Sequence, residues 1–101
     1  MKSDIDWAAK HFGYRFAATS LLAQAVTHRS AGSNNNERLE FLGDSVLGSV
    51  VSEQLYRVRP HADEGSLSRI RASLVKRSML AEIAAEIELG NLVRLGSGEL
   101  K

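Results

Sequence analysis

The longest helical pattern in the sequence, over residues 37–57, constrains the fold more than any other feature. Apolar residues from Leu39 to Val50 recur at the three- and four-residue intervals that place side chains on one side of an α-helix. The helix must end before Pro60, the only proline, because a proline inside a helix lacks the required backbone N–H. Residues 46–55 are apolar on nearly every side, so we expect this helix to be buried in the core.

Three carboxylates share one stripe of this predicted helix. At about 100° per residue, Glu37, Glu40 and Asp44 fall within roughly 60° of one another, and Phe41 lies beside them. Carboxylates this close repel one another unless solvent surrounds them or a hard cation such as Mg²⁺ neutralises them. The stripe continues into uncharged, mostly apolar residues, which favours a cation site. Glu40 and Asp44, four residues apart, could converge on one ion.

A structural interpretation of the same acids also fits the pattern. Acidic side chains in the first turn of a helix are stabilised by the helix dipole, by roughly 0.3–1 kcal/mol each. Asn34 followed by Glu37 also fits a capping box at the helix N-terminus. Motifs this short match by chance in unrelated chains. Spacing alone therefore does not choose between a metal site and a stabilised helix start.

The rest of the chain also favours helices, and no segment has the alternation of a strand, so the predicted fold class is all-α. Gly90 is expected to cap the C-terminus of the last helix. The other boundaries are helices at about residues 3–12, 20–27, 66–75 and 78–88, a loop over 31–36 and a turn over 61–65.

Composition limits the kind of protein. The 101 residues are 44% hydrophobic and 25% charged, which is typical of one small globular unit. Cysteine is absent, so disulfides and thiolate metal sites are excluded. A net charge of +1 means that attraction to nucleic acid would depend on local patches. No apolar run approaches the ~20 residues that span a bilayer, and the first residues lack a secretion signal. We therefore expect a cytoplasmic protein with no membrane contact.

The residues around the acids resemble a known family signature. Residues 36–45, read as Asn-Glu-Arg-Leu-Glu-Phe-Leu-Gly-Asp-Ser, are similar to the signature of the ribonuclease III family. Thr-His-Arg-Ser at 27–30 resembles the segment that precedes it. The blocks at 63–75, 80–82 and 95–101 resemble those that follow. From residue 21 onward nearly the whole chain is covered, whereas the first 20 residues match only in helical character.

The resemblance implies a ribonuclease III-type helical endonuclease domain. Such a domain cleaves double-stranded RNA by divalent-metal-assisted phosphodiester hydrolysis, as in the processing of ribosomal RNA precursors, and acts as a homodimer. The implied cofactor is Mg²⁺, with Mn²⁺ as a substitute. By the same resemblance Glu40 is a metal ligand, and Asp44 is both a metal ligand and the catalytic aspartate.

The resemblance also assigns a less direct role to three further residues. Glu37 and Glu64 match acidic positions near the dimer and substrate-facing region. Phe41 matches a phenylalanine that packs into a socket on the partner subunit. Two alternatives stay open: Glu64 as a solvated turn residue, and Phe41 as an aromatic ring buried within its own chain.

Four other side chains have structural interpretations. Trp7 is expected to pack in or beside the core. For His28 we favour a structural hydrogen bond, because two-metal hydrolysis requires no histidine base. Arg71 lies near the apolar side of its helix and is expected to pair with an acid. Arg69 could contact phosphate, although a solvated position is the more common role of such a residue.

Two parts of the family pattern have no match in these 101 residues. They are a second acidic segment of Asp-x-x-Glu-Ala type, which would follow Lys101, and a double-stranded RNA-binding module. We expect residues 1–101 to be the N-terminal portion of the endonuclease domain, a fragment that is inactive alone. The alternative function is a non-catalytic, dimerising, RNA-associated helical module, against which the presence of both Glu40 and Asp44 argues. An unrelated helical interaction domain would not explain the ten-residue match.

Overall fold

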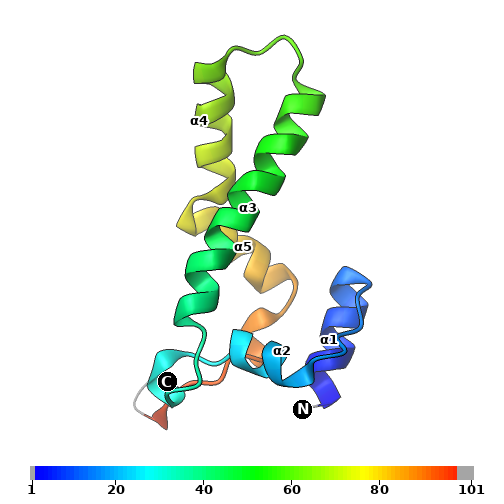
Figure 1. Cartoon of the computed structure of the whole chain (residues 1–101), viewed down its shortest axis with the longest axis vertical. Coiled ribbons are helices and arrows are strands. Elements are labelled where there is room, and N and C mark those ends of the chain that lie inside the picture. Colours follow the sequence, from blue (N-terminus) through cyan, green and yellow to red (C-terminus); the bar gives the residue numbers. More distant parts are fainter. Residues whose placement is uncertain (1, 98–101) are drawn as a thin grey trace.

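The computed structural model describes residues 2–97, which form five α-helices and two short 3₁₀ helices (Figure 1). The only pairing of extended backbone in that range is an isolated parallel bridge between Thr27 and Arg94, so the predicted all-α class is confirmed. None of the helices in the described range is long and apolar enough to cross a membrane. The elements are α1 (Lys2–Phe12), α2 (Thr19–Ala25), η1 (Arg29–Ala31), α3 (Glu37–Val58), α4 (Glu64–Val75), α5 (Arg77–Glu86) and η2 (Leu89–Asn91).

Helices α3 and α4 form an antiparallel hairpin that extends from the rest of the molecule (Figure 1). Helix α3 ends at Val58, ahead of Pro60, as the sequence predicts. Helix α4 begins at Glu64, two residues earlier than expected. Its start is fixed by Asp63, whose Oδ1 accepts a hydrogen bond from the Ser66 amide at 2.8 Å and so caps the helix. The error arose because these acidic residues were assigned to the preceding turn.

The last two helical boundaries also differ from the prediction. Lys76 has extended backbone angles, so α5 begins directly after it at Arg77. Helix α5 ends at Glu86, and the left-handed residue after it is Glu88, with φ 58°. Gly90 lies inside η2, so its predicted role as the C-terminal cap is wrong. Glycine favours the left-handed conformation, but here a glutamate adopts it.

The two ends of the described chain are joined to each other. Arg94 Nη2 donates to Asp4 Oδ2 at 2.8 Å, and Trp7 Nε1 donates to the Ile87 carbonyl. Trp7 also packs edge-on against Phe12, with ring centroids 5.2 Å apart, which agrees with its expected packing role. The buried apolar residues of the described range are Ala8, Leu22, Val26 and Leu55.

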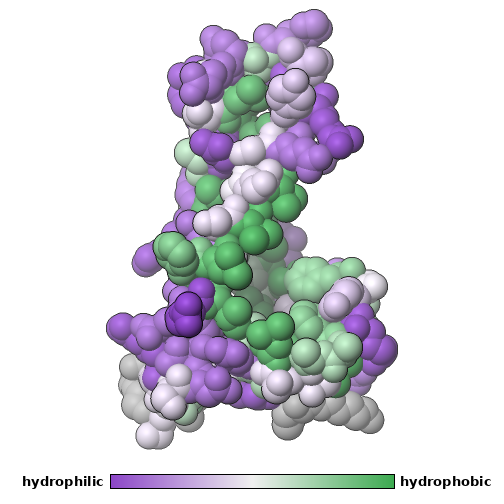
Figure 2. Space-filling view, viewed as in Figure 1, coloured by the Kyte–Doolittle hydropathy of each residue, from purple (hydrophilic) through white to green (hydrophobic). Residues whose placement is uncertain are grey.

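The predicted burial of the long helix is wrong for this chain. Leu55 is the one buried residue of α3, whereas Val46 is 54% and Val50 is 58% exposed. Helix α4 covers the side of α3 that carries Leu55, and no described helix covers the opposite side. We call Leu42, Val46 and Val50 the uncovered face of α3. Figure 2 shows apolar side chains gathered along α3 and again over α1 and α2.

Candidate functional site

The start of α3 is tied to the end of α2 by hydrogen bonds from one asparagine. The Asn36 amide donates to the Thr27 carbonyl at 2.9 Å, and Asn36 Nδ2 donates to the Ala25 carbonyl at 3.0 Å. The Asn36 carbonyl then accepts the first helical hydrogen bond, from the Glu40 amide, at 2.7 Å. Because Thr27 serves this junction, α2 ends at Ala25 and not at Thr27 as predicted.

The predicted capping box at this helix start is wrong. The cap position is Asn36, whose side chain makes no cap hydrogen bond. The Glu37 amide donates instead to Asn35 Oδ1, at 3.1 Å. Asn35 also donates from Nδ2 to the Gly32 carbonyl at 2.9 Å. Neighbouring asparagines therefore satisfy the backbone here, and Asn34 does not take the capping role.

Glu37 is paired with a cation. Its Oε2 lies 3.7 Å from Arg29 Nη1, in an ion pair whose side chains are 57% and 71% exposed respectively. An exposed pair of this kind contributes only about 0–1 kcal/mol, so its main effect is to orient the two side chains. The predicted three-acid stripe therefore has a paired glutamate at its N-terminal end.

Glu40 faces a polar hollow beside this ion pair. The hollow has a volume of about 530 Å³ and is built by the turn before α3, the first residues of α3 and the first residue of α5. Its basic side chains could attract an anion, while its carboxylates could attract a cation. The residues that line it are His28, Arg29, Asn36, Glu37, Glu40 and Arg77.

Asp44 lies one helical turn beyond Glu40, and both side chains belong to exposed residues. Their carboxylate oxygens are the hard ligands that Mg²⁺ prefers, and the spacing of four residues places them on one side of α3. Within residues 2–97, no group of three or more histidine or acidic side chains is arranged to hold a metal ion. The two acids thus fit part of a magnesium shell.

Glu64 lies far from these acids. It lines a separate hollow of about 270 Å³ between α3 and α4, together with Leu55 and Arg71. Leu55 is 18 residues beyond Glu37 along α3, which at roughly 1.5 Å per residue is about 27 Å. The structure therefore does not bring Glu64 together with Glu37, Glu40 and Asp44.

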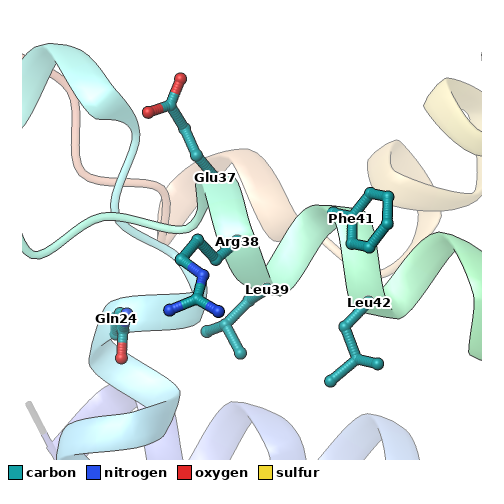
Figure 3. A pocket seen from close by; sticks show the side chains of 6 residues that line it. All are labelled: Gln24, Glu37, Arg38, Leu39, Phe41 and Leu42. Atoms are coloured by element: carbon teal, nitrogen blue, oxygen red, sulfur yellow. The ribbon is translucent and has the colours of Figure 1, made fainter.

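Phe41 projects from α3 into solvent. It is 80% exposed, so the alternative of a ring buried within its own chain is wrong for this structure. Phe41 borders a hollow of about 710 Å³ at the start of α3. Figure 3 shows Arg38 and Leu39 pointing from α3 toward Gln24 of α2, whereas Glu37 points away from it.

Two arginines near the acids were not identified as site residues from the sequence. Arg29 belongs to the Thr-His-Arg-Ser segment, which offered a signal, whereas nothing in the local sequence pattern marks Arg77. Arg71 donates to Ser52 Oγ at 2.8 Å, so its expected acidic partner was wrong. His28 has the expected structural hydrogen bonds: its Nδ1 accepts from the Ser30 amide at 3.1 Å and lies 2.8 Å from Ser30 Oγ.

Comparison with known proteins connects this arrangement to a family. A family model described as Ribonuclease-III-like matches residues 18–101. Curated relatives named Ribonuclease 3 include one from Proteus mirabilis (strain HI4320), 58% identical over 92 residues, and one from Shewanella loihica (strain ATCC BAA-1088 / PV-4), 61% identical over 89 residues. These alignments cover 91% and 88% of this chain but only 41% and 40% of those relatives.

A solved structure is also similar. The nuclease domain of ribonuclease III from Campylobacter jejuni matches with a TM-score of 0.89 and 42% identity. The match covers 94% of this chain and 67% of that one, so about a third of that nuclease domain has no counterpart here. That domain was described as having structural flexibility in a region involved in dimer formation.

Proposed function

This chain belongs to the ribonuclease-III-like family, and we propose on that basis that it is part of an endoribonuclease that cleaves double-stranded RNA. The observation that carries the proposal is the pair Glu40 and Asp44, exposed and one turn apart on α3, with Glu40 lining a hollow that Arg29 and Arg77 also line. Because the chain spans less than half the length of the relatives it matches, this activity belongs to the whole protein. Residues 1–101 would be the N-terminal portion of its endonuclease domain.

Glu40 and Asp44 would hold a divalent cation, Mg²⁺ with Mn²⁺ as a substitute. When bound, such a cation generates a hydroxide nucleophile from water and stabilises charge on the leaving oxygen of a phosphodiester. The role of the two side chains is to anchor it through hard oxygens at a fixed place on α3. Asp44 would be the catalytic aspartate.

The proposed substrate is double-stranded RNA, with ribosomal RNA precursors as the expected class. An A-form duplex presents phosphates and 2′-hydroxyls as its main recognition features. Arg29 and Arg77 border the same hollow as Glu40. Because the net charge of the chain is only +1, attraction of RNA depends on local basic residues such as these. Glu37, paired with Arg29, would face the substrate from the same side. Glu64, at the other end of the α3–α4 hairpin, would act separately from them.

The proposed assembly is a homodimer in the cytoplasm. Phe41 would pack into a socket on the partner subunit, because a ring that is 80% exposed gains most when a second surface covers it. The dimer-forming region described for the Campylobacter jejuni nuclease domain supports this assembly. The alternative of a non-catalytic helical module gains no support, since both metal-ligand candidates are present.

A chimera tests the proposed function. The matched 92 residues of the Proteus mirabilis relative are replaced by the corresponding part of this chain, so that the rest of that protein is supplied. We expect Mg²⁺-dependent cleavage of double-stranded RNA, which Asp44→Asn removes. Glu53→Gln is the matched control, because Glu53 lies on α3 but pairs with Arg57 away from the acids. A chimera without cleavage, or equal effects of both substitutions, would contradict the proposal.

A further inference from the structure

We propose that Ser30 and Gly96 form a latch that positions the acid-bearing start of α3 and Arg29 in the lining of the polar hollow. This inference rests on the proposed function for its kinetic consequences. Its structural part concerns only contacts within residues 26–40 and 94–96. Both latch residues lie outside the hollow itself, so they are positioning residues and touch no substrate.

Gly96 lies so close to the Ser30 backbone that only glycine, which has no Cβ, fits there. A Cβ added at Gly96 would lie 2.1 Å from the Ser30 carbonyl oxygen and 2.8 Å from the Ser30 carbonyl carbon. Both distances are far inside van der Waals contact, and the atoms involved are backbone atoms that cannot rotate away. The Gly96 amide donates to Ser30 Oγ at 2.8 Å, so the two residues meet through backbone and side chain together.

Ser30 is also hydrogen-bonded to His28. Nδ1 of His28 accepts from the Ser30 amide at 3.1 Å, so it is the unprotonated ring nitrogen. Ser30 Oγ, 2.8 Å from Nδ1, then donates its hydrogen to that nitrogen and keeps a lone pair for the Gly96 amide. The Ser30 hydroxyl is therefore both a donor and an acceptor, and alanine at this position could make neither hydrogen bond.

Backbone hydrogen bonds extend the latch. The His28 amide donates to the Arg94 carbonyl at 2.9 Å, and the Arg94 amide donates to the Val26 carbonyl at 2.8 Å. Residues 26–30 and 94–96 therefore run alongside each other, with the Thr27–Arg94 bridge between them. These segments are far apart in sequence, so nothing local would hold them together without these contacts.

The latched turn carries two links to the site. Thr27 accepts the Asn36 amide hydrogen bond at 2.9 Å, and Asn36 in turn accepts from the Glu40 amide at 2.7 Å. Arg29, inside the turn, reaches Glu37 at 3.7 Å. If the turn shifts, both the first turn of α3 and Arg29 in the lining of the hollow shift with it. Misplacing reacting groups by about 1 Å can cost on the order of a hundredfold in rate.

The first test measures the latch without any activity. Amide hydrogen exchange is followed by NMR in the 101-residue chain for the amides of His28, Arg94 and Asn36. We expect Gly96→Ala and Ser30→Ala each to accelerate exchange on the order of tenfold at these amides. Gly90→Ala is the matched control, because a Cβ at Gly90 meets nothing within 4 Å. Unchanged exchange at Asn36 in both variants would overturn the latch.

The second test separates positioning from general stability. In the Proteus mirabilis chimera, Gly96→Ala and Ser30→Ala should lower kcat at least tenfold relative to Gly90→Ala, with KM within about twofold and with the protein still fully folded at the assay temperature. An active chimera in which kcat is the same for all three variants would overturn the latch. A parent chimera with no activity would instead contradict the proposed function, and the exchange measurement would still decide the latch.

Discussion

Asp4 and Arg94 form an ion pair, with Arg94 Nη2 2.8 Å from Asp4 Oδ2, and the Asp4 side chain is only 5% exposed. The Arg94 side chain is 37% exposed, so solvent reaches the guanidinium but is largely excluded from the carboxylate. The contact fastens α1 to the segment that also bridges Thr27. It therefore bears on the stability of the whole described fold.

The ion pair should contribute unequally when either partner is removed. Arg94→Leu should lower the free energy of unfolding by about 2–3 kcal/mol, because it leaves a buried carboxylate without this cation. Asp4→Asn should cost less, since an amide oxygen can still accept the guanidinium hydrogen bond. Urea denaturation of the 101-residue chain measures both. Asp6→Asn is the control, since Asp6 is 55% exposed and 4.0 Å from its partner Arg15. Equal effects of all three substitutions would mean that the buried pair has no special role.

A second stability prediction concerns the uncovered face of α3. Val50→Ser should change the free energy of unfolding of this chain by less than about 0.5 kcal/mol, because Val50 is 58% exposed. Leu55→Ala, at a residue that is 7% exposed on the same helix, should cost about 2–4 kcal/mol. Chemical denaturation compares them directly. A large loss from Val50→Ser would show that another surface covers this face in solution.

The 101-residue chain should not cleave double-stranded RNA at the rate of a complete enzyme. Two carboxylates such as Glu40 and Asp44 would supply only part of the oxygen ligands that a magnesium ion takes. Among the described residues, no group of three or more acidic or histidine side chains is arranged to hold a metal ion. Incubation with end-labelled duplex RNA and Mg²⁺ checks this. Efficient cleavage that disappears with Asp44→Asn would show that this chain holds a complete site.

Glu40→Gln should separate metal binding from RNA binding in the Proteus mirabilis chimera. The substitution removes a charged oxygen ligand, so the Mg²⁺ concentration for half-maximal cleavage should rise on the order of tenfold or more. Binding of double-stranded RNA, measured in Ca²⁺ to prevent cleavage, should stay within about twofold of the parent. Glu53→Gln again serves as the control on the same helix. Equal loss of binding and cleavage would make Glu40 a structural residue.

Phe41→Ala should shift the chimera from dimer toward monomer. A phenylalanine ring buries on the order of 150–250 Å² when covered, and such rings are frequent anchors of interfaces. Sedimentation velocity over a dilution series gives the dissociation constant. Tyr56→Ala is a suitable control, since Tyr56 is 78% exposed at the other end of α3. A mutant that dissociates over the same concentrations as the parent would exclude Phe41 from the interface.

Local periodicity predicted the helices because an amphipathic helix repeats every 3.6 residues, a pattern visible within a short window. It placed α3 from Glu37 nearly to its end at Val58. It failed where other segments decide the structure. Helix α2 ends early because Thr27 pairs with Asn36 and Arg94, and no residue within α2 signals those pairings. It also failed for burial of α3, because periodicity identifies an apolar face without supplying the element that covers it.

Some residues of the candidate site could likewise be predicted from the local sequence, and others could not. Glu40 and Asp44 were predicted from spacing on one helix and from the family signature, and their metal-binding roles stay predictions. Arg77 was missed because it lies 37 residues beyond Glu40 in the sequence and meets the hollow only in the folded structure. Gly96 lies in the block at 95–101 that resembles the family, but its contact with Ser30 is visible only in the folded structure.

The contacts that join the two ends of the chain also set an order of folding. The α3–α4 hairpin forms contacts between neighbouring segments, whose loop closure costs little entropy and is fast. Helix α1 contacts α2 early in the sequence, but its hydrogen bonds to Ile87 and Arg94 need residues that are made some 80 to 90 positions later. On the ribosome, the indole hydrogen bond of Trp7 therefore cannot form until Ile87 has been made. Tryptophan fluorescence of arrested nascent chains of increasing length would detect the moment when that contact forms.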